Sequence, residues 1–164
     1  MKRLLKTLCK PLSFLPALCM MYLIFSFSGQ AGEESSKLSL KVTKTAVIAI
    51  NKVTDQGWNE AQMEQRVQQY HHYVRKAAHM TEYCILAITI ATPLHVYGLR
   101  GIALILVSGI ICLLFAAGDE YHQSFVAARV PSGKDVLIDS TGALMGIFLT
   151  LLFSWIARGG KKTL

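Results

Sequence analysis

Four long apolar segments limit the folds open to this chain more than any other feature of its sequence. They cover residues 11–28, 77–97, 102–118 and 135–157. Each has about 17–23 residues, close to the ~20 that an α-helix needs to cross the ~30 Å hydrocarbon core of a bilayer. Because lipid offers no hydrogen bonds to backbone N–H and C=O groups, a spanning segment must bond internally, which favours helices over open strands. The sequence therefore predicts an all-α integral membrane protein built as a four-helix bundle.

The composition agrees with a membrane protein and excludes a disordered or highly charged chain. Of the 164 residues, 52% are apolar and 16% are charged, whereas about 25% are charged in typical soluble domains. The net charge of +7 would suit a membrane surface or a nucleic acid. The basic residues are dispersed, however, without an aromatic platform or groove-reading motif, so we expect no nucleic-acid partner. The length leaves room for a single domain, which we place at residues 1–164.

The ends and short connections of the chain predict its orientation. If all four segments cross the bilayer, the N-terminal residues, the turn at 98–101 and the tail after residue 157 lie on one side. These segments hold 4, 1 and 3 basic residues and no acid. The total count of Lys and Arg is nearly even between the two sides, 8 against 9, and does not decide the orientation by itself. The short ends that carry only basic residues favour a multi-pass protein with both termini in the cytoplasm. The basic start, the first apolar segment and the small residues after it would also suit a cleaved signal peptide.

The connection between the first two spans, about residues 29–74, is long enough to carry structure of its own. Apolar residues recur there at helical spacing in two stretches, Leu38, Val42, Val47, Ile50, Val53 and then Met63, Val67, Tyr70, Val74. We expect both stretches to form amphipathic helices that lie on the outer leaflet or cap the bundle. A solvated helical hairpin packed on itself is an equally good interpretation. The second stretch is expected to run straight into the second span.

Ionisable residues gather where the predicted spans meet the outer face. On the second span, Arg75, His79 and Glu82 recur at i, i+4 and i+7, which places them on one face of a helix. Asp119, Glu120 and Gln123 follow directly after the third span, and a stripe of Ser132, Asp135, Asp139, Gly142 and Gly146 runs from just before the fourth span into it. The two glycines would let another helix approach closely, as small residues do in membrane bundles.

These polar groups are costly to insert alone, so we expect them to face one another. A charged residue at the bilayer centre costs ~2.5–3.5 kcal/mol on insertion scales, and less near the edge. The three helices should therefore converge on a pocket that opens to the outer face, with Arg75, Lys76 and Arg129 as counter-charges. An ion-pair network that only locks the helices together is the alternative interpretation.

The residue types in this predicted pocket suit acid–base chemistry on a phosphate or carboxylate ligand. The candidate catalytic residues are His79, Glu82, Asp119, Glu120, Asp135 and Asp139, and the candidate substrate-binding residues are Arg75, Lys76, Gln123, Arg129 and Ser132. A histidine beside a carboxylate can move a proton, and arginine can bind phosphate with two parallel hydrogen bonds. The carboxylates of Glu120, Asp135 and Asp139 could also hold a divalent cation such as Mg²⁺ or Ca²⁺. The remaining histidines of this region, His71, His72 and His122, are expected to be surface or hydrogen-bonded residues.

The same residues carry a resemblance to a known family. The matching stretches are Arg75-Lys76-x-x-His79-x-x-Glu82-Tyr83, Asp119-Glu120-x-x-Gln123-x-Phe125 and Arg129-x-x-Ser132-x-x-Asp135-x-x-x-Asp139-x-x-Gly142. A further stretch, Phe25-Ser26-Phe27-Ser28-x-Gln30, closes the first span. In this ordered combination, over about residues 12–157, the chain resembles the VanZ-like membrane protein family.

The resemblance implies a protein of the bacterial cytoplasmic membrane. The family is named for a protein linked to resistance against teicoplanin, a glycopeptide directed at cell-wall precursors. Its polar motif has been likened to a lipid-modifying site for the head groups of phospholipids or polyprenyl-linked sugars. We therefore expect membrane lipids or lipid-linked precursors as partners, either processed by the pocket or bound without chemistry so that drug access is limited. A small transporter is less favoured, because four helices without repeats or a broken helix offer little for alternating access.

Overall fold

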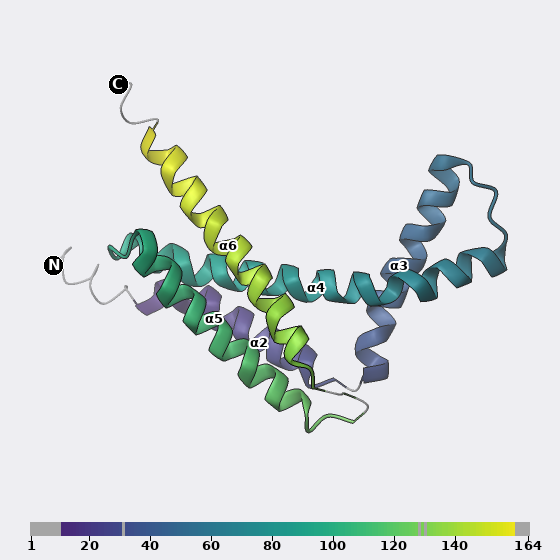
Figure 1. The fold of residues 1–164 in the computed structure, drawn as a ribbon, viewed down its shortest axis with the longest axis horizontal. Helices are drawn as coiled ribbons and strands as arrows, with labels where there is room; N and C mark the ends of the chain where they lie inside the picture. The colour runs from purple at the N-terminus through teal and green to yellow at the C-terminus, as the bar shows by residue number, and fades with distance from the viewer. Residues whose placement is uncertain (1–10, 31, 128, 130, 160–164) are drawn as a thin grey trace.

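The computed structural model describes residues 11–30, 32–127, 129 and 131–159, and helices make up most of these ranges (Figure 1). The elements are a short 3-10 helix η1 (Pro11–Phe14) and the helices α2 (Leu15–Ser28), α3 (Gly32–Thr54), α4 (Glu60–Val96), α5 (Gly101–Gln123) and α6 (Gly133–Gly159). The described ranges contain no strand. The predicted all-α fold class is therefore confirmed.

Three of the four predicted spans are confirmed as helices long and apolar enough to cross a membrane. They are Pro11–Ser28, Gly101–Gln123 and Gly133–Ala157. The predicted second span, 77–97, is the C-terminal part of α4, which begins at Glu60 and continues without a break. This stretch is less apolar because it carries His79 and Glu82 near its start. That it crosses the membrane as the fourth span remains our prediction.

The long helix α4 organises the fold, because α2, α3, α5 and α6 all pack against it. Its buried face carries Tyr83, Leu86, Ala87, Ile90 and Ala91. These meet Ile24 of α2, Leu104, Cys112 and Ala116 of α5, and Ala143 and Ile147 of α6. Large apolar side chains on the opposite faces of α5 and α6, such as Leu114 and Phe148, are exposed, as expected for helix faces that contact lipid rather than protein.

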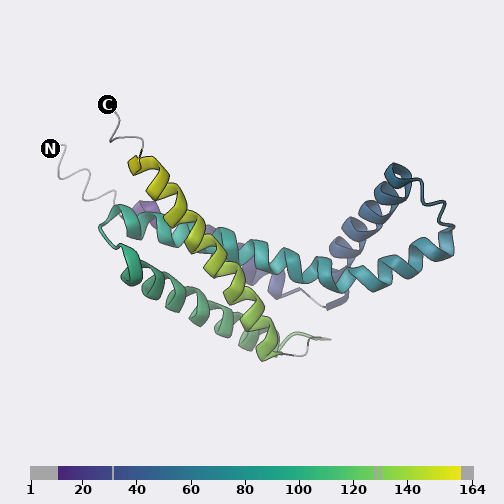
Figure 2. The ribbon, with the colours of Figure 1, turned by 45° about the horizontal axis from the view of Figure 1, so that its top comes forward.

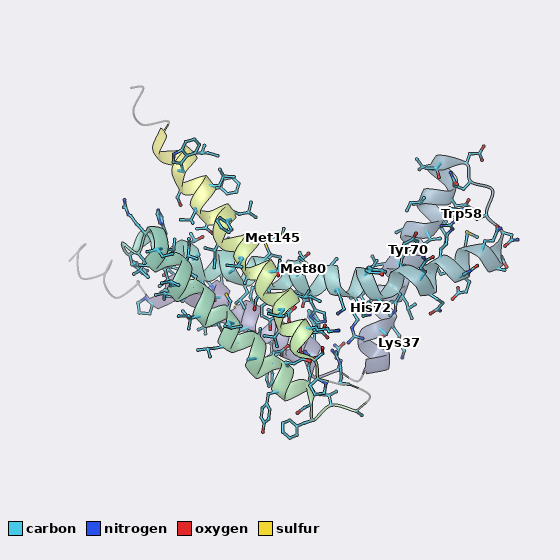
Figure 3. All side chains as sticks on the ribbon, viewed as in Figure 1. Lys37, Trp58, Tyr70, His72, Met80 and Met145 are labelled. Carbon is cyan, nitrogen blue, oxygen red and sulfur yellow. The ribbon has the colours of Figure 1, made fainter. Side chains whose placement is uncertain are left out.

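Glycines bring α4 and α6 into backbone contact. A Cβ atom added at Gly142 would lie 2.8 Å from the Cα of Met80, and one at Gly146 would lie 3.0 Å from the carbonyl carbon of Cys84. Figure 3 places Met80 where the two helices cross. The predicted close approach of another helix to these glycines is thus confirmed, and the partner is α4.

The first part of α4 and the whole of α3 form an arm that projects from the other helices (Figure 2). Asn59 caps the start of α4 by accepting from the N–H of Gln62, whose side chain accepts in return from the N–H of Asn59. Val47 of α3 and Val67 of α4 are buried between the two helices. Both predicted stretches of the long connection are therefore helical, and they pack on each other.

The two ends of the helical assembly are chemically different. The start of η1, the turn between α4 and α5, and the end of α6 lie toward one end (Figure 1). There the hydroxyl groups of Ser13 and Tyr97 are hydrogen-bonded, and Gly98 and Gly101 adopt positive φ angles of 108° and 56° that make the turn between α4 and α5. The start of α3, the end of α5 and the start of α6 lie toward the other end. Residues of α4, α5 and α6 that were predicted for the polar site line a pocket there.

Candidate functional site

A pocket of about 160 Å³ lies where α4, α5 and α6 meet at the polar end. Its walls include most of the residues predicted from the sequence: Arg75, Lys76, His79, Glu120, Gln123, Arg129, Asp135 and Asp139. The other three predicted residues each contact a residue of the wall: Glu82 contacts His79, Asp119 contacts Gln123, and Ser132 contacts Glu120. The structure therefore brings together the three polar stripes that lie far apart in the sequence.

Helix α4 contributes a basic stripe to the pocket. Arg75 and His79 line it one helical turn apart, and the Nδ1 atom of His79 lies 3.5 Å from Oε2 of Glu82. Both side chains of this pair are partly exposed, at 23% for His79 and 28% for Glu82, so they can reach a ligand as well as each other. His72 is exposed, as predicted for a surface residue, and it also lines the pocket. Its spacing, three residues before Arg75 and seven before His79, could have revealed this.

Buried hydrogen bonds connect α2, α5 and the connection between α5 and α6. Ser28 Oγ donates to Asp119 Oδ2 over 2.6 Å, and Gln123 Nε2 donates to the same oxygen over 2.9 Å. Gln123 Oε1 in turn accepts from Arg129 Nη1 over 2.9 Å. Ser28 was quoted only in the family resemblance, and the structure shows that it anchors Asp119. These hydrogen bonds form a chain from Ser28 through Asp119 and Gln123 to Arg129, which we call the relay. The relay holds the Arg129 side chain in the wall of the pocket.

The relay leaves polar atoms unsatisfied beside the pocket. Among the described residues, Oδ1 of Asp119 and the Nε and Nη2 atoms of Arg129 are buried without a hydrogen-bond partner. Burial lowers the pKa of the Arg129 guanidinium, and the nearby charge of Arg75 acts in the same direction. Buried polar groups are almost always paired in folded proteins. Two donor nitrogens without a partner on one guanidinium are able to bind an anion such as phosphate or carboxylate.

Helix α6 contributes the acidic side of the pocket. Asp135 Oδ1 accepts from Lys76 Nζ over 2.8 Å, and Asp139, one turn further along α6, is buried. Glu120 accepts from the backbone N–H of Ser132. The side chain of Ser132 accepts from the N–H of Lys134 over 3.3 Å, so this residue shapes the start of α6 rather than lining the pocket.

Cation binding by the acidic residues gains no support from their arrangement. Within the ranges that the structure describes, no group of three or more His, Cys, Asp or Glu side chains is placed so that it could hold a metal ion. Asp135 is also occupied by its ion pair with Lys76. The arrangement instead suits an anion held by arginine and lysine, with carboxylates to orient it.

Replacing Asp119 by alanine should destabilise the protein. The hydroxyl of Ser28 and the amide of Gln123 would lose their shared buried acceptor, and leaving a buried donor unpaired costs ~1–3 kcal/mol. We expect the free energy of unfolding in detergent to fall by about this amount in a denaturant titration. Asp119→Asn, which keeps one acceptor oxygen, should lose less. An alanine variant as stable as the parent chain would show that the relay does not hold the helices together.

Comparisons with known proteins place the chain in one family. The model of the VanZ/LLP1 family matches residues 13–154. This range includes the whole of α2, α3, α4 and α5 and most of α6, and therefore every residue of the pocket. No curated protein and no solved structure matches the chain.

Proposed function

Because the chain belongs to the VanZ/LLP1 family, we propose that its pocket binds and processes the phosphate-bearing head group of a phospholipid or lipid-linked cell-envelope precursor. The observation that carries this proposal is Arg129, whose guanidinium is fixed by Gln123 and keeps two buried donor nitrogens, Nε and Nη2, without a partner. Arg75 and Lys76 line the same pocket. Guanidinium groups match phosphate oxygens in geometry and charge, and the apolar helices around the pocket suit a ligand that resides in a membrane.

The chemistry that we propose is proton transfer at the phosphate or its leaving group. His79 lines the pocket opposite the acidic residues of α6, and Glu82 lies close enough to orient and polarise its ring. A neutral imidazole can accept a proton from a nucleophile and return it to a leaving group. Asp119 and Gln123 position Arg129, while Glu120, Asp135 and Asp139 would orient the head group or an attacking water molecule.

The location that we propose is a bacterial cytoplasmic membrane with the pocket at its outer face. The basic ends of the chain support cytoplasmic termini. The pocket lies at the opposite end of the helices from the start of η1 and the end of α6. A site that faces outward would meet the lipids and precursors on which cell-wall antibiotics act. A contribution to resistance against teicoplanin-type glycopeptides would follow from altering or occupying them.

Lipid retention tests the anion-binding role of Arg129. The full-length protein, reconstituted in vesicles of phosphatidylglycerol and phosphatidylethanolamine and then extracted in detergent, should carry bound lipid that mass spectrometry identifies. Arg129→Ala should retain at least tenfold less, because hydrogen bonds to charged groups contribute ~1.5–3 kcal/mol and ~1.4 kcal/mol corresponds to tenfold in affinity. Arg129→Lys should fall between the two.

The control for this experiment is Arg100→Ala, which removes an exposed arginine from the turn at the opposite end of the molecule. It should retain lipid like the parent protein. Equal lipid retention by Arg129→Ala and the parent protein would contradict the proposed site.

A non-catalytic binder is the alternative function. The 3.5 Å separation between His79 and Glu82 exceeds the usual length of a hydrogen bond, so this pair is not held as tightly as the relay through Asp119. In this case the pocket would hold an envelope lipid or an antibiotic target and limit access of the drug, without chemical change.

A further inference from the structure

A second cavity, of about 270 Å³, adjoins the polar pocket. It lies between the end of α2, the first turns of α3 and the middle of α4. Its walls are mainly apolar and include Phe27, Leu38, Val42, Val74 and Ala78. We call this cavity the α3 groove. Because Phe27 lies at the end of a helix long enough to span the membrane, the groove begins where the bilayer meets the outer part of the protein.

The α3 groove and the polar pocket share a wall. Arg75 and His79 line both cavities, and Glu82 lines the groove. A single molecule could therefore place a charged group on the pocket side of this wall and an apolar part on the groove side. This combination is the chemical pattern of an amphiphilic lipid.

The apolar side chains that α3 contributes to the groove are largely exposed. Leu38 is 69% exposed and Val42 is 51% exposed. Between them, Ser39 is buried and its hydroxyl lies 2.9 Å from Nε2 of His71, which fastens α3 to α4. The position of these apolar residues is thus fixed by a polar contact rather than by burial in a core, and a hydrocarbon chain would cover them.

We propose that the α3 groove holds one acyl chain of a glycerophospholipid whose phosphate occupies the polar pocket. This inference rests on the proposed function, because it requires that the lipid phosphate is bound in the polar pocket. Helix α3 then serves as the wall that holds the chain against α4.

The charges of the pocket favour a glycerophospholipid over a diphosphate-linked precursor. Arg75, Lys76 and Arg129 line the pocket together with three carboxylates, those of Glu120, Asp135 and Asp139. One phosphodiester adds a single negative charge to this balanced set. A diphosphate would add further negative charge beside the carboxylates, where like charges repel.

Photolabelling locates the acyl chain directly. The full-length protein is reconstituted in phosphatidylethanolamine and phosphatidylglycerol vesicles that contain a trace of phosphatidylethanolamine with a diazirine midway along one acyl chain. After irradiation and proteolysis, we expect labelled peptides from the part of α3 around Leu38 and Val42 and from the part of α4 around Val74. Val42→Trp, which fills the groove, should lower the labelling of α3 at least fivefold.

Two further variants separate a filled groove from a disturbed fold. Ala78→Phe fills the groove from α4, starting from an exposed alanine, and should reproduce the loss. Val53→Trp adds the same side chain at a position of α3 that is 83% exposed and outside the groove. It should label like the parent protein.

The outcomes distinguish this inference from the proposed function. Unchanged labelling in Val42→Trp and Ala78→Phe, with lipid retention still dependent on Arg129, would overturn the α3 groove and leave the proposed function standing. If lipid retention is independent of Arg129, both fail. Stronger labelling of α3 by a diazirine-bearing polyprenyl phosphate than by the phospholipid, at equal amounts, would overturn the assignment to a glycerophospholipid.

Discussion

A Gly142→Leu variant is expected to lose much of the stability of the protein, because no space for a side chain exists between α6 and α4. Even a single Cβ atom at this position would overlap the carbonyl group of Met80. Overpacking a core costs ~1–3 kcal/mol when flexible side chains can adjust, and here the obstacle is backbone. We expect the midpoint of thermal unfolding in detergent to fall by about 5–10 °C or more, as followed by circular dichroism.

The same variant should also damage the site, since Lys76, His79 and Asp139 lie within one turn of the crossing on their respective helices. A matched control is Gly118→Leu on α5, where a Cβ atom would meet nothing within 4 Å. This control should unfold close to the parent protein. If Gly142→Leu and Gly118→Leu unfold at the same temperature, the close crossing of α4 and α6 does not contribute to stability.

Three of the four spans could be predicted as long apolar helices, because a bilayer imposes both a length and a hydrogen-bonding rule on the chain. Helical spacing then placed Arg75, His79 and Glu82 on one face, and the structure brings that face toward Asp119 and Asp139. The glycine contacts followed from the same reasoning, since small residues one turn apart allow close packing. Local periodicity was therefore sufficient to predict which residues share a helix face.

What could not be predicted depends on contacts between distant segments. Ser28 is a lone polar residue at the end of an apolar helix, and its acceptor, Asp119, lies 91 positions later in the sequence. The spacing of residues could not reveal this pairing. By contrast, the sequence did predict that a helix of the long connection runs into the span beginning at residue 77, and α4 is continuous there; Asn59 caps this helix, which begins at Glu60.

The site and the arm are connected because both are built on the single continuous helix α4. Because α4 continues from the arm into the predicted span, the residues that face α3 and those that face the pocket lie on one rigid element. His71 bonds to Ser39 of α3, and His72 lines the pocket. The contact with α3 and the pocket wall are thus adjacent on one helix.

His79→Gln should separate the two candidate functions more sharply than any other change. Glutamine keeps a polar side chain of similar reach but cannot exchange a proton near neutral pH. If the pocket is catalytic, turnover of an envelope lipid should fall by about 10²–10⁴-fold, the usual contribution of a general acid or base. Lipid retention through Arg129 should remain within about threefold of the parent, because the phosphate contacts are left in place.

The pattern across variants then decides between chemistry and binding. Loss of turnover in both His79→Gln and Arg129→Ala, with loss of lipid retention only in Arg129→Ala, supports the enzyme. If cells that express His79→Gln keep full glycopeptide resistance while Arg129→Ala abolishes it, the pocket acts as a binder. Glu82→Gln adds a graded test, since it removes the carboxyl group beside the imidazole without removing the imidazole itself. In a catalytic pocket it should slow turnover less than His79→Gln does, whereas in a binding pocket neither substitution should matter.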